Sequence, residues 1–109
     1  MMLRARCELL MYTENGLEIP GKVFELLKLI SETGSINTAV RELGVSYSYA
    51  WNTLNRLNCK LDTPIVVTRR GGNGGGVSTV TEAGLRIVDE YDRLRERLES
   101  VLEGGITHV

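Results

Sequence analysis

Residues 35–61 read SINTAVRELGVSYSYAWNTLNRLNCKL and contain two runs of apolar side chains at helical spacing. In each run the apolar residues recur at intervals that keep them on one helix face. The two faces are Ile36, Ala39, Val40 and Leu43, then Ala50, Leu54, Leu57 and Leu61. Gly44 separates the runs, and Ser35 and Ser46 precede them as N-cap residues. Two helices joined by a tight turn with a glycine form a helix-turn-helix unit, which the sequence predicts over residues 35–61.

The segment before this unit predicts a β-hairpin and one further helix. From Lys22 to Thr33, apolar residues fall at positions i, i+3, i+4 and i+7, so we expect a helix there that ends at Gly34. Farther upstream, short apolar runs flank Asn15-Gly16, a dipeptide that supplies the positive φ angles of a tight hairpin turn. A β-hairpin is therefore predicted within residues 5–19.

The segment after the unit predicts a two-stranded wing and a long helix. Residues 65–67 are rich in β-branched side chains, and residues 77–80 return as a second strand after the glycine run at 71–76. Thr81 is a good N-cap for a helix over residues 81–103. We therefore expect one α+β domain over residues 1–109. It is a winged helix-turn-helix with an N-terminal hairpin, a wing at 65–80 and a long C-terminal dimerisation helix.

Composition restricts the class of protein and its location. The chain has 109 residues, 42% of them hydrophobic, and a formal net charge of −1. No apolar run approaches the roughly 18 residues of a membrane span, and charges interrupt the N-terminus, so we expect no signal peptide and a cytoplasmic location. Cys7 and Cys59 form no metal-binding pair and are expected as reduced thiols. Residues 44–80 hold four basic residues and one acidic residue, and this net charge of +3 suits a nucleic-acid surface.

The second helix of the unit presents a polar face opposite its apolar one. At about 100° per residue, this face holds Ser48, Asn52, Asn55 and Cys59, and one flank holds Tyr49, Arg56 and Lys60. Asparagine can bond adenine and arginine can bond guanine, so these side chains suit the major groove of DNA. The alternative is the solvated face of an ordinary helix. Trp51 is expected in the core, whereas Tyr47 is either a packing residue or a phosphate contact.

The glycine run at residues 71–76 has more than one interpretation. A Walker loop would end in Gly-Lys-Ser/Thr and open a helix, whereas this run ends in Gly76-Val77-Ser78 and leads into a strand. As a wing, the run brings backbone N–H groups close to DNA phosphates. A hairpin tip without a ligand is the alternative. The wing residues expected at the DNA are Arg69, Arg70, Gly72, Asn73 and Gly74.

Five apolar residues of the last helix form a row with heptad spacing, which we call the seam. They are Ile87, Tyr91, Leu94, Leu98 and Val101. Such a row packs either within its own domain or against a second helix. Because the row extends past the expected edge of the domain, the pattern favours a homodimer interface.

Residues suited to catalysis are absent from the pattern. His108 is the only histidine and lies next to the C-terminus, and no carboxylate pair belongs to an evident pocket. We therefore expect no enzyme, no cofactor and no metal site.

A more specific pattern runs through the same elements. It comprises Thr33-Gly34-Ser35-Ile36, Ala39, Val45-Ser46-Tyr47 with Ala50-Trp51, Arg69-Arg70 with the glycine run, and Thr81-Glu82-Ala83-Gly84. Over roughly residues 17–102 the chain resembles the N-terminal DNA-binding domain of the ModE-type molybdenum regulators and, more distantly, the LysR-type domains. The resemblance implies transcription control by a winged-helix dimer, with the long C-terminal helix and the N-terminal hairpin contributing to the interface, and for such a dimer we expect a partly palindromic operator in double-stranded DNA. It assigns Ser46, Tyr47, Ser48, Tyr49 and Asn52 to the recognition-helix motif.

Two departures limit what the resemblance implies. Asn73 stands where the family's wing commonly has a basic residue, and Val77 stands where it has a further glycine, so weaker wing contacts are expected. Full-length members continue into a molybdate-binding portion, which these 109 residues do not include, so we expect no oxyanion effector to bind this chain. Two rival functions stay open. One is a winged helix used for protein–protein contact, and the other is an oxyanion-binding protein that uses the glycine run.

Overall fold

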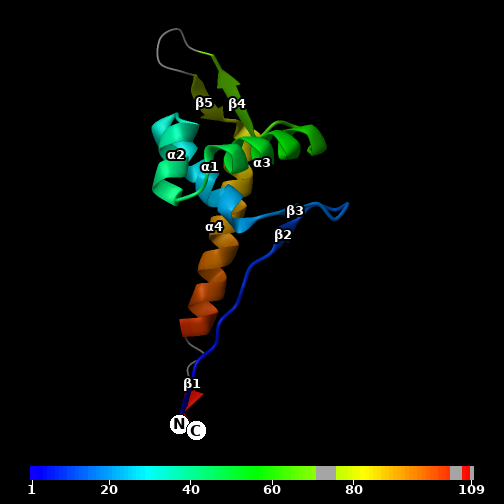
Figure 1. Ribbon diagram of the computed structural model, residues 1–109. Helices are drawn as coiled ribbons and strands as arrows, with labels where there is room; N and C mark the ends of the chain where they lie inside the picture. The colour runs from blue at the N-terminus through cyan, green and yellow to red at the C-terminus, as the bar shows by residue number, and fades with distance from the viewer. Residues whose placement is uncertain (71–75, 104–106, 109) are drawn as a thin grey trace.

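The computed structural model describes residues 1–70, 76–103 and 107–108 (Figure 1). Its helices are α1 (Gly21–Thr33), α2 (Ile36–Leu43), α3 (Tyr47–Lys60) and α4 (Glu82–Glu103). Its strands are β1 (Met2–Leu3), β2 (Met11–Tyr12), β3 (Glu18–Ile19), β4 (Val66–Arg69), β5 (Val77–Val80) and β6 (Thr107–His108). The predicted order of hairpin, three helices, wing and long helix is confirmed.

Three residues stabilise the start of α2, its end, and the start of α3. The side-chain oxygen of Ser35 accepts a hydrogen bond from the Thr38 N–H at 3.1 Å, and that of Ser46 accepts one from the Tyr49 N–H at 3.0 Å. Gly44 ends α2 with a φ of 75°, a conformation that costs glycine little. The predicted caps are therefore confirmed, and Gly44 and Ser46 fix the end of α2 and the start of α3 within three residues of each other.

The hydrophobic core forms around α1, which packs against α2, α3 and α4. Its buried side chains, each at most 1% exposed, are Val23, Phe24, Leu26, Leu27 and Ile30. From α3, Leu54 and Leu57 join this cluster, as predicted from the apolar face. Full burial of one such side chain contributes about 1.5–3 kcal/mol, so this cluster is the main source of the domain's stability.

The wing is anchored to the helical body at its base. β4 and β5 pair antiparallel from Val66↔Val80 to Arg69↔Val77. The Ser78 N–H of β5 donates to the Gly34 carbonyl at 2.9 Å, and the Thr81 N–H donates to the Ile65 carbonyl at 3.0 Å. These bonds connect the wing to the end of α1 and to the start of α4, so the wing base is held on the helical body.

Gly84 allows α4 to approach this base closely. A Cβ atom there would lie 2.3 Å from the Ile65 carbonyl oxygen and 2.7 Å from Val80 Cγ1. Thr81 begins the same turn: its hydroxyl accepts from the Gly84 N–H at 3.1 Å and donates to the Pro64 carbonyl at 2.6 Å. The Thr-x-x-Gly pattern therefore has a structural role in this chain, as a cap and a close contact.

The N-terminal hairpin differs from its prediction in length and in turn type. Within residues 5–19 only β2 and β3 pair, and Asn15 does not have the positive φ expected of it. Gly16 alone has one, 87°, and the Thr13 N–H donates to the Leu17 carbonyl at 2.9 Å. This is a three-residue loop with a glycine bulge instead of a two-residue turn.

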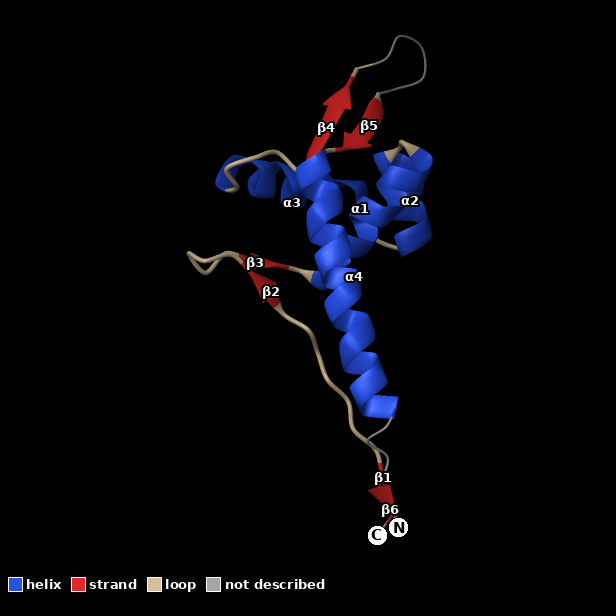
Figure 2. Cartoon of the chain, turned by 180° about the vertical axis from the view of Figure 1, so that it is seen from behind, coloured by secondary structure: helices blue, strands red, loops and turns tan. Residues whose placement is uncertain are grey.

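The molecule is elongated along α4. Its extents are 62 × 31 × 21 Å and its radius of gyration is 16.7 Å, against about 13 Å for a compact chain of this length. α4 projects from the helical body, and the N-terminal segment runs beside it to the far end (Figures 1 and 2). There β1 pairs with β6, a contact that the sequence did not predict. No helix in the described ranges has the length and apolar character of a membrane span.

Candidate nucleic-acid interface

The exposed face of α3 is the polar face that the sequence predicted. Ser48, Asn52, Asn55 and Cys59 are all exposed, whereas Ala50, Leu54 and Leu57 on the other side are at most 2% exposed. Tyr49, Arg56 and Lys60 are exposed on one flank. Ser46 precedes them, and since its side-chain oxygen caps the helix, it also positions this face. α3 thus presents amides, hydroxyls and cations on one continuous surface.

Trp51 is not a core residue, and its prediction was wrong. Its side chain is 38% exposed and stacks on Tyr47, which is 45% exposed, with ring centroids 6.2 Å apart. The reason is rotation along the helix. Ala50, Thr53, Leu54 and Leu57 already fill the buried side, and Trp51 lies on the flank of that side. Both aromatic side chains therefore extend the exposed surface of α3.

A groove separates this flank of α3 from the first strand of the wing. Trp51 and Asn55 line it from α3, and Val66, Val67 and Thr68 line it from β4. Val67 is itself 45% exposed. The groove therefore opens on the same surface as the polar face of α3.

Asn58 holds the two sides of this groove together. Its Oδ1 accepts from the Ile65 N–H at 2.9 Å, and its Nδ2 donates to the Val66 carbonyl at 2.8 Å. The Ile65 N–H is bonded to Asn58, and the Ile65 carbonyl accepts from the Thr81 N–H. The strand β4 therefore begins at Val66, one residue after the predicted start at Ile65. Sequence reasoning missed Asn58, although at about 100° per residue it lies with Trp51 beside the buried face and not with Asn52 on the polar face.

The base of the wing adds exposed positive charge. Arg69 ends β4 and Arg70 follows it, and both are exposed. The Thr68 and Ser78 hydroxyls bond at 2.9 Å and close the base across the two strands. The other predicted wing contacts, Gly72, Asn73 and Gly74, lie outside the described residues.

Several cations of the molecule, those of α3 and the wing base among them, form no ion pair in the described part of the chain. The ion pairs found among the described residues join α1 to α4 or lie within α4, as in Lys28–Asp92 and Arg86–Glu82. In the same part of the chain, Arg56, Lys60, Arg69 and Arg70 have no acidic partner. Their charge is therefore available to an external anion.

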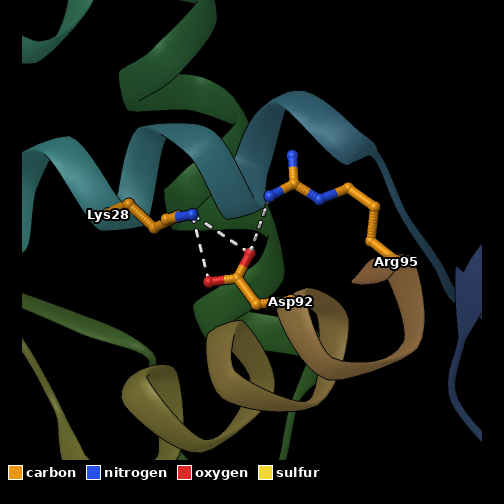
Figure 3. Close-up of polar contacts among 3 residues, drawn as sticks. All are labelled: Lys28, Asp92 and Arg95. Carbon is orange, nitrogen blue, oxygen red and sulfur yellow. Dashed lines mark hydrogen bonds and ion pairs between the residues drawn. The ribbon is translucent and has the colours of Figure 1, made fainter. Parts of the chain in front are cut away.

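The direction of α4 is set by an aromatic stack and an ion-pair cluster. Phe24 and Tyr91 stack with centroids 4.3 Å apart. Beside them the Asp92 carboxylate accepts from Lys28 Nζ at 3.0 Å and lies 3.6 Å from the Arg95 guanidinium (Figure 3). These side chains are half-buried, and ion pairs that water still reaches contribute about 1 kcal/mol or less, so the stack and the packing of Val88 contribute more to holding α4 on α1.

The inner and outer residues of the seam have different neighbours. Ile87 and Tyr91 pack against the core of their own domain. Leu98 lines a second groove, between α4 and residues 7–10, while Leu94 is half-buried and Val101 is 71% exposed. In a single chain, therefore, only the distal part of the seam has surface left for a second copy.

Comparison with known families gives a match across these same elements. Residues 22–85 match the family described as bacterial regulatory helix-turn-helix protein, lysR family. That range contains nearly all of α1, then α2, α3, the wing and the first turn of α4, and so it includes the whole of the candidate interface.

Individual relatives carry molybdenum-related names. The chain is 35% identical over 105 residues to the molybdenum transport protein ModE of Azotobacter vinelandii, covering 86% of this chain and 39% of that protein. It is 37% identical over 71 residues to the DNA-binding transcriptional dual regulator ModE of Escherichia coli K12, covering 65% of this chain and 27% of that protein. The predicted resemblance to ModE-type DNA-binding domains is confirmed, and the chain spans less than half the length of these relatives.

Solved structures with the same fold are more distant in sequence. A mutant of Lactococcus lactis ZitR superposes with a TM-score of 0.63 at 16% identity, covering 94% of this chain and 66% of that chain. Streptococcus pneumoniae FabT in complex with DNA superposes with a TM-score of 0.62 at 17% identity, covering 83% of this chain and 64% of that chain. Both similarities support the winged-helix fold.

Proposed function

Because this chain belongs to the lysR family of bacterial regulatory helix-turn-helix proteins, we propose that it binds specific DNA sequences and regulates transcription. The observation that carries the proposal is the surface formed by α3 and the wing base. It combines exposed asparagines with four cations that have no acidic partner among the described residues. A surface of this composition suits DNA, in which phosphates lie beside hydrogen-bonding base edges.

The chemistry of each side chain on this surface indicates whether it contacts a base or a phosphate. Asn52 and Arg56 are the proposed base contacts, because each can make two parallel hydrogen bonds to one base. Tyr49 and Ser48 add hydroxyls near the start of α3, the part of a recognition helix that reaches deepest. Arg69 and Arg70 are proposed to bind phosphates, and such contacts raise the affinity for every sequence.

We further propose a homodimer that binds a partly palindromic operator. A single helix-turn-helix contacts few base pairs, so two copies normally bind half-sites about one helical turn apart. The exposed Val101, the half-buried Leu94 and the elongated shape support an interface along distal α4. Since the partner is the cell's DNA, the proposed location is the cytoplasm.

The test is selection of bound fragments from the source genome, followed by titration of a selected fragment and a scrambled one at several salt concentrations. We expect preference for the selected fragment and a log–log salt slope of about −0.9 for each phosphate contacted. Equal, salt-independent binding of both fragments would contradict the proposal and favour a module for protein–protein contact. Calorimetry with molybdate tests the oxyanion alternative, and we expect no binding heat.

A further inference from the structure

The aromatic pair of α3 forms an exposed apolar surface without a role in the contacts proposed so far. Tyr47 and Trp51 lie nearly parallel, with an interplanar angle of 9°. Trp51 also lines the groove beside β4, whose other apolar lining residues are Ile36, Leu54, Pro64, Val66 and Val67. Large aromatic side chains left in water next to an apolar groove usually mark a binding surface.

We infer that Trp51, supported by Tyr47, recognises thymine in the operator through its C5-methyl group. The inference rests on the proposed function, because it requires DNA to lie along α3. In the major groove thymine presents this methyl group beside its O4 acceptor, and apolar side chains distinguish it from cytosine. Asn55 lines the same groove and belongs to the polar face of α3, so one base step can meet both surfaces.

Charge favours DNA over an apolar protein segment as the occupant of this groove. α3 contains Arg56 and Lys60 and no acidic residue. On the other side, β4 leads from the groove to Arg69 and Arg70. Arg56 and Lys60 lie across the polar face of α3 from the groove, so cations border the whole surface formed by α3 and the wing base, and such a surface suits a polyanion that carries methyl groups.

The first experiment replaces single thymines of a selected half-site with deoxyuridine, which removes only the methyl group. One buried methyl group is worth ~0.8 kcal/mol, so we expect about a fourfold rise in Kd at one or more positions with the wild-type protein. In Trp51→Ala that rise should disappear, because the contact is already lost. Tyr12→Ala is the matched control: Tyr12 is 72% exposed but lies in the N-terminal hairpin, so the methyl effect should persist.

The second experiment uses the wild-type protein, so it holds even if Trp51→Ala fails to fold. 5-Bromouracil at the sensitive position places bromine where the methyl group was, and ultraviolet light should crosslink it to the peptide that contains Tyr47 and Trp51. Crosslinking elsewhere, or a methyl effect that persists in Trp51→Ala, would overturn the inference while leaving DNA binding intact. Absence of DNA binding by the wild type would instead contradict the proposed function.

Discussion

At the residue scale, the strongest test of the proposed DNA interface is the replacement of Asn52 and Arg56. Both are exposed on α3, so Asn52→Ala and Arg56→Ala should leave the fold unchanged, and each should weaken operator binding by about 1–3 kcal/mol. Fluorescence anisotropy with the selected fragment measures this loss, and circular dichroism checks the fold. Arg97→Ala, on the distal half of α4, is the control and should bind normally. Wild-type affinity in both interface variants would show that another surface contacts the bases.

Gly84 provides a residue-scale test of the fold itself. In Gly84→Ala the new Cβ would meet the Ile65 carbonyl oxygen and Val80 Cγ1, and backbone atoms move little, so we expect a loss of about 1–3 kcal/mol in unfolding free energy. Urea denaturation measures it. Gly21→Ala is the matched control, because the nearest atom to its Cβ would be the Tyr91 hydroxyl at an ordinary 3.5 Å. Equal unfolding free energies for the two variants would contradict the close contact.

Single residues also show where sequence reasoning worked and where it failed. The caps at Ser35, Ser46 and Gly44 were predictable because each depends on neighbours within four residues. The contacts of Asn58 were not, since its partners lie at the start of β4, and the rotation of Trp51 away from the buried side did not reveal that it would line a groove beside β4. Local chemistry is visible in a sequence, whereas the partner of a flanking side chain belongs to the tertiary structure.

At the element scale, the wing is expected to act on affinity more than on specificity. The double change Arg69→Ala with Arg70→Ala should weaken binding to all sequences alike and reduce the salt slope by up to about two units. Filter-binding titrations across salt concentrations measure both quantities. Arg93→Ala with Arg97→Ala removes the same charge from α4 and should leave the slope unchanged. Altered sequence preference with an unchanged slope would mean that the arginines contact bases.

Helices and strands differ in how far their own residues determine where they begin and end. α1, α2 and α3 were predicted to within about a residue because apolar periodicity and caps agree. The N-terminal hairpin pairs only two residues on each strand, so its extent depends on contacts with the rest of the fold. The β1–β6 pair joins opposite ends of the chain, and no local signal encodes such a contact.

At the scale of the whole molecule, the proposed dimer depends on the distal seam. Changing Leu94 and Leu98 together to glutamate should yield a monomer with much weaker operator binding, because buried carboxylates without partners are costly. Sedimentation of wild type and variant at tens of micromolar measures the change. Leu85→Glu makes the same kind of change once, at an exposed leucine near the start of α4, and should remain dimeric. A monomeric wild type would refute the interface.

The seam also shows the limit of a helical pattern as a guide to assembly. The five residues share one spacing, yet Ile87 and Tyr91 pack inside their own domain. Heptad spacing shows that a row of side chains needs a partner, but it does not show which partner. Only the three-dimensional position of α1, with Phe24 stacked on Tyr91, separates the inner part of the row from the outer part.

The pairing of β1 with β6 brings the two ends of the chain together at the end of the molecule opposite the wing (Figure 1). A few added residues can therefore join them, and new ends can be opened in the loop after Tyr12 without cutting α1, α2, α3 or the wing. Circular permutation of this kind is generally tolerated where termini are adjacent. For the same reason, a fluorophore or a tether attached at either end stands away from the proposed DNA-binding surface.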